Sequence, residues 1–404
     1  MPNIITDKEK IEEVLTRSID RVYPTKQGLE ELLSSGKQIR VYVGIDPTAD
    51  YVHVGHSTNY LLLERLHKLG HKIIVLVGDF TAMIGDPSDK TAARAPLTKK
   101  QVRENLKSFK EQIGKILNFE DTDNPIDFVY NSTWLAALDF EKLVELASQF
   151  TVQQMLERDM FEKRLKDNKP LYVHEFFYPL LQGYDSVALE ADLEVGGTDQ
   201  MFNMLAGRTL ARRYLNREKF VLTTPLLAHP VTNEKLMSKS TGTGIALNER
   251  PEDMFGKVMA LPDEIMLQMF RDCTRVSLDE IEQKKAFLEK GENPRNIKLE
   301  LAREITALYH GADAAESARN HWKQIFSEKK VPDTIPEVPA GRGVLLIDFL
   351  VEENISKSKT EARRLFGQGA VEFDDAIVKD ISFVLERGGI LRVGKKVLVR
   401  VCVK

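Results

Sequence analysis

An early part of the chain places two short apolar runs on either side of a helical pattern. The segment Arg40–Ile45 (RVYVGI) is mostly apolar, leucines recur at helical spacing up to Leu69, and a second apolar run occupies Lys72–Val77 (KIIVLV). Continuous apolar runs of this length are typical of central strands in a parallel sheet, and Gly70 suits the end of a helix. The pattern therefore predicts a strand, a helix and a strand that form one βαβ unit.

The pattern up to residue 326 alternates helices with a few further strands. Apolar residues recur at helical spacing in 8–34, with breaks at Pro24 and Gly28, and in 99–117, 139–165, 174–190 and 251–326. Strands are predicted at 192–195 and 220–223, and a further helix is predicted to begin near Gln200. Strands that alternate with helices favour a parallel sheet. We predict an α/β fold: a Rossmann-type parallel-sheet domain, then a helical domain and a small α+β domain.

A proline-rich stretch marks the clearest boundary. Residues 327–343 contain three prolines within eight residues and no periodic apolar face, so they read as a stiff linker. Beyond it, helix-like segments at 345–352 and 359–367 precede short strands at 371–373 and 396–401. The predicted divisions are 1–222, a Rossmann-type domain with a helical insertion; 223–326, a loop and a helical domain; 327–343, the linker; and 344–404, the small domain.

Composition and charge narrow the class of protein. The 404 residues are 42% hydrophobic and 29% charged, which is usual for a soluble globular protein, and two cysteines are too few for a zinc cluster or a disulfide framework. We find no run long enough to span a membrane and no secretory signal, so we expect a cytoplasmic protein. The net charge is −4, yet residues 341–404 hold 12 Lys and Arg against 9 Asp and Glu, a net of +3. A polyanion would prefer this tail.

Two histidines stand at the predicted start of the first long helix. His53 and His56 are three residues apart and can face one ligand, while the free amides of a helix N-terminus suit phosphate. Gly55 leaves space for a flat ring against the backbone. Two surface histidines, or two metal ligands that lack a third, are the alternatives.

A second candidate for phosphate binding lies about 180 residues later, in the segment Met237-Ser238-Lys239-Ser240 and the Gly-rich residues after it. A lysine on a flexible loop can approach a pyrophosphate, although a solvated loop lysine is the usual fate of Lys. With the histidine turn, this loop predicts a grip on ATP from both sides.

Two further sets of residues are candidates for the rest of a binding pocket. Gly196 and Gly197 at the end of a strand allow a nucleotide to approach, and Asp199 can hold ribose hydroxyls; an ordinary turn with Asp199 as helix N-cap is the alternative. Tyr178, Gln182 and Asp185 share one face of a helix, either lining a pocket or forming a solvated stripe.

These motifs, in this order, resemble the class I aminoacyl-tRNA synthetases. The segment Tyr42–Asp50 with His53–His56, the segment Ile84–Ser88, and the Tyr178–Asp185 and Val195–Gln200 segments are similar to the tyrosyl-tRNA synthetases. The tail from Leu345, with its stretch 358–371, resembles the RNA-binding module that this family often carries.

The resemblance implies a role for each matching residue. Tyr42 and Asp185 would bond the phenolic hydroxyl of tyrosine; Tyr178, Gln182 and Asp86 would receive its ammonium group; Gln200 would lie near its carboxylate. ATP would contact Gly44, Asp46, Gly55, Gly197, Asp199 and Lys235, and its phosphates Thr48, His53, His56, Lys90, Arg94, Lys239 and Ser240. RNA would contact Lys357, Lys359, Arg363, Arg364, Lys395 and Lys396, unless this is only a solvated amphipathic helix. Two positions depart from the family pattern: Leu236 replaces a lysine, whose role either passes to Lys235 or is absent, and Asn59 stands where many relatives have threonine.

The activity implied by the resemblance is the ATP-dependent activation of L-tyrosine to tyrosyl-adenylate, followed by transfer to tRNA(Tyr). Mg²⁺ would accompany the phosphates, no protein metal ligands are expected, and the family suggests a homodimer. A tryptophanyl-tRNA synthetase is the nearest rival, for which Tyr42 and Asp185 would be ill suited. A small-molecule nucleotidyltransferase would leave the tail unexplained, and a non-catalytic RNA-binding protein would not need His56.

Overall fold

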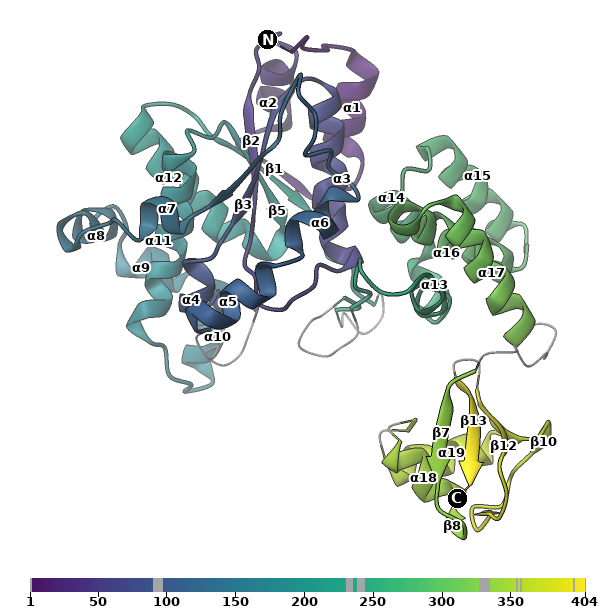
Figure 1. Cartoon of the computed structure of the whole chain (residues 1–404). Helices are drawn as coiled ribbons and strands as arrows, with labels where there is room; N and C mark the ends of the chain where they lie inside the picture. The colour runs from purple at the N-terminus through teal and green to yellow at the C-terminus, as the bar shows by residue number, and fades with distance from the viewer. Residues whose placement is uncertain are drawn as a thin grey trace. The chain divides into compact units, whose positions relative to one another are not determined.

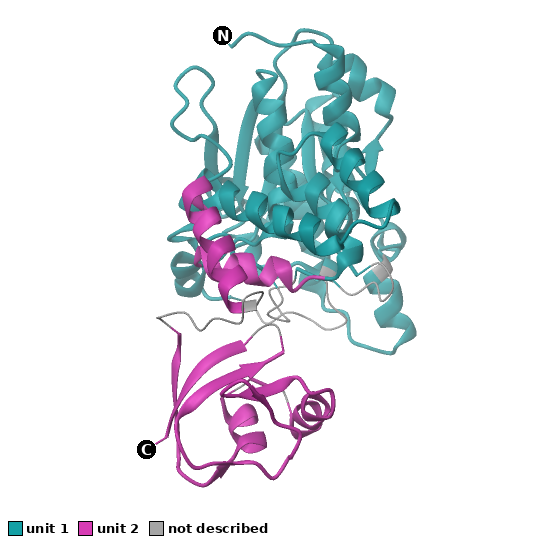
Figure 2. Cartoon of the chain, turned by 90° about the vertical axis from the view of Figure 1, so that its right-hand side faces the viewer, with its two compact units in different colours: residues 1–249, 262–309 teal, residues 250–261, 310–404 magenta. Residues whose placement is uncertain are grey.

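The computed structural model describes residues 2–89, 97–229, 235–237, 244–326, 335–353, 355–356, 358–394 and 397–403. The chain forms two compact units, the first of residues 1–249 and 262–309, the second of residues 250–261 and 310–404 (Figure 2). Each unit has buried apolar residues of its own. Among the described residues, no helix is both long enough and apolar enough to cross a membrane. The domain boundaries inferred from the sequence stay predictions.

The first unit is built around a sheet of six strands in the order β1-β6-β5-β2-β3-β4 (Figure 1). Five strands run parallel, and β1 pairs antiparallel with β6 at one edge. The strands are β1 Arg21–Tyr23, β2 Arg40–Ile45, β3 Lys72–Val77, β4 Asp127–Tyr130, β5 Leu193–Gly197 and β6 Phe220–Thr224. The structure therefore confirms the predicted parallel α/β sheet, and β2 and β3 have the predicted bounds.

The strand order creates a switch point between β2 and β5. From β2 the chain moves outward through β3 and β4, and it then returns to the other side of β2 for β5 and β6. Helices that follow neighbouring strands here leave in opposite directions, so a crevice opens at the carboxyl ends of β2 and β5. The fold thus places the candidate site at this end of the sheet.

Most of the helices in the first unit lie around the sheet (Figure 1). The first of the long helices, α3, follows β2 and ends before Gly70, whose φ of +94° is a conformation that glycine adopts without strain. The helices of this unit are α1 Lys8–Thr16, α2 Lys26–Leu33, α3 Val54–Lys68, α4 Thr81–Ile84, α5 Lys99–Leu106, α6 Phe109–Gly114, α7 Ser132–Leu135, α8 Phe140–Ala147, α9 Val152–Leu156, α10 Asp159–Lys166, α11 Val173–Ala188, α12 Met201–Leu215, α14 Met266–Cys273, α15 Leu278–Glu289 and, almost entirely, α16 Pro294–His310, with 3₁₀ turns at Pro87–Asp89, Thr198–Gln200 and Asp263–Ile265.

Some predicted elements are shorter than expected. The helical prediction for 8–34 is wrong over Arg21–Tyr23, which form β1 because their backbone groups pair with β6, a contact that local periodicity cannot signal. The predicted helices 99–117 and 139–165 are broken into α5–α6 and α8–α10, and new helices begin where Asp139 and Thr151 act as N-caps. The strand β4 was not predicted.

The second unit contains α13 Pro251–Met259, which packs on α17 Ala312–Phe326, and the small C-terminal domain. That domain has a five-stranded sheet in the order β10-β9-β12-β13-β7, a two-stranded sheet β11-β8 and two helices with a shared apolar core. Its elements are β7 Glu337–Ala340, β8 Val344–Leu345, α18 Leu346–Glu352, α19 Lys359–Gly367, β9 Val371–Phe373, β10 Ala376–Ile377, β11 Val384–Leu385, β12 Gly389–Val393 and β13 Val397–Val403. The predicted α+β composition is confirmed, although β7, β8 and β10–β12 were not predicted.

Candidate active site

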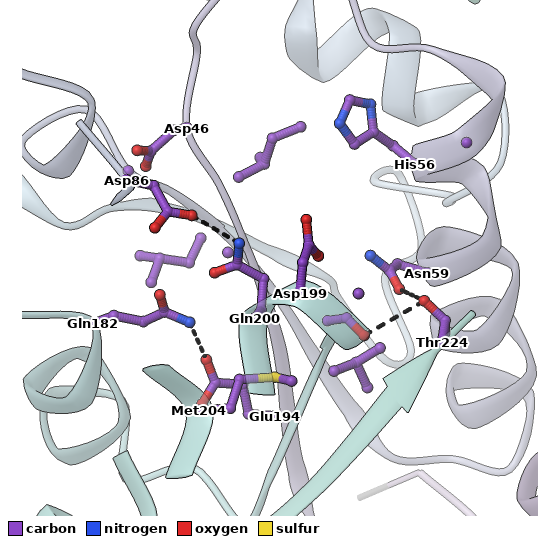
Figure 3. Close-up of a pocket in the computed structure, with 18 of the residues that line it drawn as sticks. Asp46, His56, Asn59, Asp86, Gln182, Glu194, Asp199, Gln200, Met204 and Thr224 are labelled. Atoms are coloured by element: carbon purple, nitrogen blue, oxygen red, sulfur yellow. Dashed lines mark hydrogen bonds between the residues drawn. The ribbon is translucent and has the colours of Figure 1, made fainter. Parts of the chain in front are cut away.

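A cavity of about 260 Å³ opens at the switch point of the sheet (Figure 3). Its walls come from the carboxyl ends of β2 and β5, the first turn of α3, one face of α11, residues 224–227, Lys235 and Met237. It is lined by every described residue that the sequence assigned to tyrosine or ATP: Tyr42, Gly44, Asp46, Thr48, His53, Gly55, His56, Asp86, Tyr178, Gln182, Asp185, Gly197, Asp199, Gln200 and Lys235. Lys90, Arg94, Lys239 and Ser240 lie outside the described residues.

The two histidines form a stacked pair at the start of α3. His53 is the N-cap, and its ring lies 3.6 Å from the ring of His56, centroid to centroid. The backbone N–H of His53 donates to Nδ1 of His56 at 3.2 Å, so neutral His56 carries its proton on Nε2. His56 therefore presents an N–H group beside the free amides of the helix N-terminus (Figure 3).

The segment around the late loop lies against this turn. A β-carbon built on Gly55 would come within 3.0 Å of Cβ of Met237. Beyond the loop, the N–H of Val54 donates to the carbonyl of Ile245 at 2.9 Å, and His53 forms a β-bridge with Ala246. The histidine turn and Met237, the first residue of the motif about 180 residues later, thus border one cavity.

Asp199 and Lys235 form an ion pair at the nucleotide side of the cavity, with Nζ and Oδ2 3.2 Å apart. A β-carbon on Gly197 would lie 2.7 Å from Oδ1 of Asp199, so glycine leaves this side of the cavity open. Asp199 does not cap a helix, because Gly197 holds the N-cap position of the 3₁₀ turn and Gln200 that of α12. The alternative reading of Asp199 as an N-cap is therefore wrong. Nearby, the hydroxyl of Thr224 donates to Oδ1 of Asn59 at 2.7 Å (Figure 3).

Helix α11 turns Tyr178, Gln182 and Asp185 into the cavity, so the alternative of a solvated stripe is wrong. Asp185 is 2% exposed and accepts hydrogen bonds from Nε1 of Trp134 at 2.7 Å and from Nδ2 of Asn131 at 3.2 Å. Burial raises the pKa of Asp185 well above its usual range, and these two donors oppose that shift. Its two carboxylate oxygens are held in place by one donor each.

Two further carboxylates share the floor of the cavity with Gln200. Asp46 accepts from the hydroxyls of Tyr178 at 2.9 Å and Thr81 at 2.7 Å. Asp86 pairs with Arg158, with Nη2 and Oδ1 3.1 Å apart, and accepts from Nε2 of Gln200 at 2.7 Å (Figure 3). The concentration of carboxylates at this end of the cavity favours a positively charged group of a ligand.

Tyr42 lies fully buried at the inner wall, and its hydroxyl is 2.7 Å from Oγ of Ser186. Glu194 also lines the cavity and pairs with Lys219, and sequence reasoning missed both residues. The signal was present, because a glutamate within the apolar run of β5 needs a buried partner. Trp134, Asn131 and Arg158 were also missed, since β4 and the break before α10 were not predicted.

Metal binding and RNA binding depend on different parts of the chain. Within the described residues, no group of three or more His, Cys, Asp or Glu could hold a metal ion.

In the C-terminal domain, α19 begins at Lys359, whose Nζ pairs with Oδ1 of Asp348 at 2.6 Å. The same helix exposes Arg363 and Arg364. The other predicted RNA contacts, Lys357, Lys395 and Lys396, lie outside the described residues.

Relatives in sequence align with nearly the whole chain. The family model of class I tRNA synthetases for tryptophan and tyrosine matches residues 34–327. A tyrosine–tRNA ligase of Carboxydothermus hydrogenoformans is 44% identical over 384 residues, which are 93% of this chain and 92% of the relative. A tyrosine–tRNA ligase of Thermotoga maritima is 40% identical over 401 residues, which are 98% of each chain.

Solved structures share the fold at lower identity. A tyrosyl-tRNA synthetase from Archaeoglobus fulgidus, complexed with L-tyrosine, superposes with a TM-score of 0.61 at 23% identity and covers 78% of this chain and all of its own. A truncated mitochondrial tyrosyl-tRNA synthetase from Aspergillus nidulans gives a TM-score of 0.65 at 23% identity, over 79% of this chain and 94% of that one.

Proposed function

The chain belongs to the tyrosyl-tRNA synthetases, and on that premise we propose which of its residues bind and activate tyrosine. The enzyme uses ATP to convert L-tyrosine into tyrosyl-adenylate and pyrophosphate, and it then transfers the tyrosine to tRNA(Tyr). The cavity at the switch point is the site of the first step.

Tyrosine binds against the face of α11 that carries Tyr178, Gln182 and Asp185. The phenolic hydroxyl meets Asp185 and Tyr42, and the ammonium group meets Asp86, Tyr178 and Gln182, with Gln200 near the carboxylate. Support comes from the cavity, which all of these residues line. A phenol can donate one hydrogen bond and accept another, whereas an indole N–H only donates, so a carboxylate beside a hydroxyl suits tyrosine better than tryptophan.

ATP occupies the other half of the cavity. Gly44, Asp46, Gly197 and Asp199 contact the adenosine, and Gly55 leaves space for it. Thr48, His53 and His56 face the phosphates, with the N–H of His56 and the amides of the first turn of α3 as donors. Lys90, Arg94, Lys239 and Ser240 add further donors to the phosphates, and Lys235 takes the place of the lysine that Leu236 replaces.

The reaction requires positioning more than proton transfer. The tyrosine carboxylate is ionised at neutral pH, so it needs no general base. One of its oxygens attacks the α-phosphorus of ATP in line; the new O–P bond forms as the bond to pyrophosphate breaks, and the electron pair leaves with pyrophosphate. Donors that surround the phosphates stabilise the charge that develops on them.

Mg²⁺ arrives with ATP in this proposal. The ion would be held mainly by phosphate oxygens and water, because Mg²⁺ keeps several waters and seldom uses a site made only of protein ligands. It supplies charge neutralisation on the phosphates.

The C-terminal domain binds tRNA(Tyr) through a basic face. Lys357, Lys359, Arg363, Arg364, Lys395 and Lys396 contact the RNA backbone. Support comes from the exposure of Arg363 and Arg364 on α19 and from the net charge of +3 that the sequence gives residues 341–404. We expect this synthetase to act in the cytoplasm.

A homodimer is supported by exposed apolar side chains on α8, α9 and α10 and at the start of α11; of these helices, α8 contacts α11 and α9 contacts α10. Large contiguous apolar patches on a surface usually mark an interface. These exposed side chains are Phe140, Val144, Val152, Leu165, Tyr172 and Val173. A second copy of the chain is the partner that we propose for them.

The observation that carries this proposal is that the histidine turn and Met237 line one cavity together with Asp185. Incubation with radiolabelled tyrosine and Mg-ATP, followed by gel filtration, should isolate tyrosyl-adenylate bound to the enzyme. Addition of tRNA(Tyr) should then move the label to the RNA. Label that stays free under both conditions would contradict the proposal.

A further inference from the structure

A buried ion pair lies at the inner wall of the cavity, which Glu194 lines and Lys219 does not, and the proposed reaction gives the pair no role. Lys219 immediately precedes β6, and Glu194 is the second residue of β5; they are 0% and 1% exposed. The ammonium of Lys219 pairs with Oε2 of Glu194. Buried ion pairs seldom stabilise a fold more than apolar residues of the same size would. The pair therefore calls for a role other than stability.

All three protons of the Lys219 ammonium have acceptors. Besides Glu194, Nζ donates to Oγ of Ser186 at 2.8 Å and to the carbonyl of Met204 at 3.1 Å. Although burial lowers the pKa of Lys219, this arrangement holds it in the charged form, since a neutral amine would leave one acceptor unpaired. The space is made by Gly207, where a β-carbon would lie 2.5 Å from both Nζ of Lys219 and Oγ of Ser186.

One branch of this network reaches Tyr42. The hydroxyls of Ser186 and Tyr42 are 2.7 Å apart, and Nζ of Lys219 lies 5.6 Å from the centroid of the Tyr42 ring. Because the ammonium of Lys219 can only donate, it occupies a lone pair of the Ser186 hydroxyl. The proton of that hydroxyl is then available for the oxygen of Tyr42. The alternative acceptor, Oε2 of Glu194, is farther from Ser186, at 3.4 Å. Tyr42 is thereby able to direct its proton into the cavity.

The other branch reaches Gln182. Nε2 of Gln182 donates to Oε1 of Glu194 at 3.0 Å (Figure 3). Since a carboxylate only accepts, Glu194 fixes which end of the amide faces it and leaves the carbonyl oxygen of Gln182 for the cavity. A carbonyl oxygen is the end of an amide that can bind an ammonium group.

We propose that Lys219 and Glu194 are a positioning pair that sets the donor and acceptor directions of Tyr42 and Gln182, and so determines specificity for a phenolic amino acid. This inference rests on the proposed function, in which both residues touch tyrosine. With tyrosine bound, protons point one way along the series Lys219, Ser186, Tyr42, ligand hydroxyl and Asp185. A ligand without the hydroxyl leaves the proton of Tyr42 without an acceptor and gives Asp185 one hydrogen bond fewer, which is costly in a buried site.

Two variants test the proposal. Ser186→Ala cuts the connection to Tyr42 and leaves the ion pair in place. Glu194→Gln with Lys219→Met removes both charges together, because Lys219→Met alone would leave a buried carboxylate without its partner. Steady-state pyrophosphate exchange is measured with tyrosine and with phenylalanine. We expect kcat/KM for tyrosine to fall about tenfold, the scale of one lost hydrogen bond, with the value for phenylalanine and KM for ATP unchanged.

Lys298→Met is the matched control, because Lys298 is a buried lysine that pairs with Asp263 away from the cavity. It should leave the ratio of tyrosine to phenylalanine activity at the wild-type value. An unchanged ratio in Ser186→Ala and in the double variant, or an equal loss for both amino acids, would overturn the positioning role. If the double variant does not fold, Ser186→Ala decides. A wild-type enzyme without tyrosine-dependent exchange would instead overturn the proposed function itself.

Discussion

Gly55 and Met237 lie in contact across the nucleotide side of the cavity, and a β-carbon on Gly55 would approach Cβ of Met237 to 3.0 Å and the ring of His53 to 3.1 Å. One residue belongs to the first turn of α3, and the other leads into the late loop. Their proximity ties the position of that segment to the absence of a side chain at residue 55.

Substitution of Gly55 should therefore affect ATP more than tyrosine. In Gly55→Ala, either Met237 or His53 must move by a few tenths of an ångström. Misplacement of catalytic groups by distances of up to 1 Å can cost up to about 100-fold in rate. We expect a lower kcat and a raised KM for ATP in pyrophosphate exchange, with KM for tyrosine unchanged. Gly256→Ala, where a β-carbon meets nothing within 4 Å, should behave as wild type.

Replacement of Asp185 tests the phenol site. In Asp185→Asn, one oxygen becomes an NH₂ group that must face Trp134 or Asn131, both of which donate to the carboxylate. We expect tyrosine-dependent exchange to be nearly abolished while thermal unfolding remains cooperative. The neighbouring Tyr184 lies outside the cavity lining, so Tyr184→Phe should retain full exchange. Normal exchange in Asp185→Asn would remove this residue from the tyrosine site.

The basic face of α19 should matter for tRNA and not for adenylate formation. Arg363→Ala combined with Arg364→Ala removes two exposed charges. Each phosphate contact contributes about one to the slope of log affinity against log salt concentration, so the slope for tRNA(Tyr) should fall by about two. Exchange should stay at the wild-type rate. Lys379→Ala, a change at an exposed lysine of the same domain, is the control, and equal effects on tRNA binding would argue against a defined RNA face.

The apolar surface on α8–α11 should hold two copies together. Phe140 and Val173 are 79% and 73% exposed, and glutamate at both positions would place charges in the proposed interface. We expect Phe140→Glu with Val173→Glu to halve the molar mass in light scattering. Ile377→Glu changes an exposed apolar residue elsewhere and should leave the mass unchanged. A wild-type chain that already runs as a monomer would contradict the proposal.

Acid should destabilise the fold through His71. Burial lowers the pKa of His71 to about 4, and neither ring nitrogen has a hydrogen-bond partner among the residues that the structure describes. The unfolded chain binds this proton below about pH 6.5, whereas the folded chain does not until about pH 4, so stability falls as the pH drops through this window. The loss between pH 7 and pH 5 should be about 2 kcal/mol.

Urea unfolding at the two pH values measures this loss. His71→Leu should remove most of the difference in unfolding free energy, while leucine in place of the half-buried His321 should not. A loss of equal size in the His71→Leu protein would assign the acid sensitivity to other groups.

The sequence allowed the central strands and the residues around the ligands to be predicted, because these depend on local patterns. Arg40–Ile45 and Lys72–Val77 are apolar runs between clear helical signals, and Tyr178, Gln182 and Asp185 share a helical face at fixed spacing. Their interpretation as one site came from a resemblance, and the cavity brings them together.

What was missed depends on contacts between distant segments. The strand β1 exists because β6 pairs with it, and Trp134 reaches Asp185 only after β4 has joined the sheet. Lys219 illustrates the same limit, since nothing near it in the sequence shows that its ammonium lies among Ser186, Glu194 and Met204. Such partners follow from the tertiary fold.

Pyrophosphate exchange with a panel of amino acids is the most direct test of a single cavity that binds ATP beside a phenol. Exchange of labelled pyrophosphate into ATP should depend on tyrosine, should be lost in His56→Ala, and should be far weaker with phenylalanine or tryptophan at the same concentration. Exchange that is equally fast with tryptophan, or that persists without any amino acid, would contradict the assignment of Tyr42 and Asp185 to the phenolic hydroxyl.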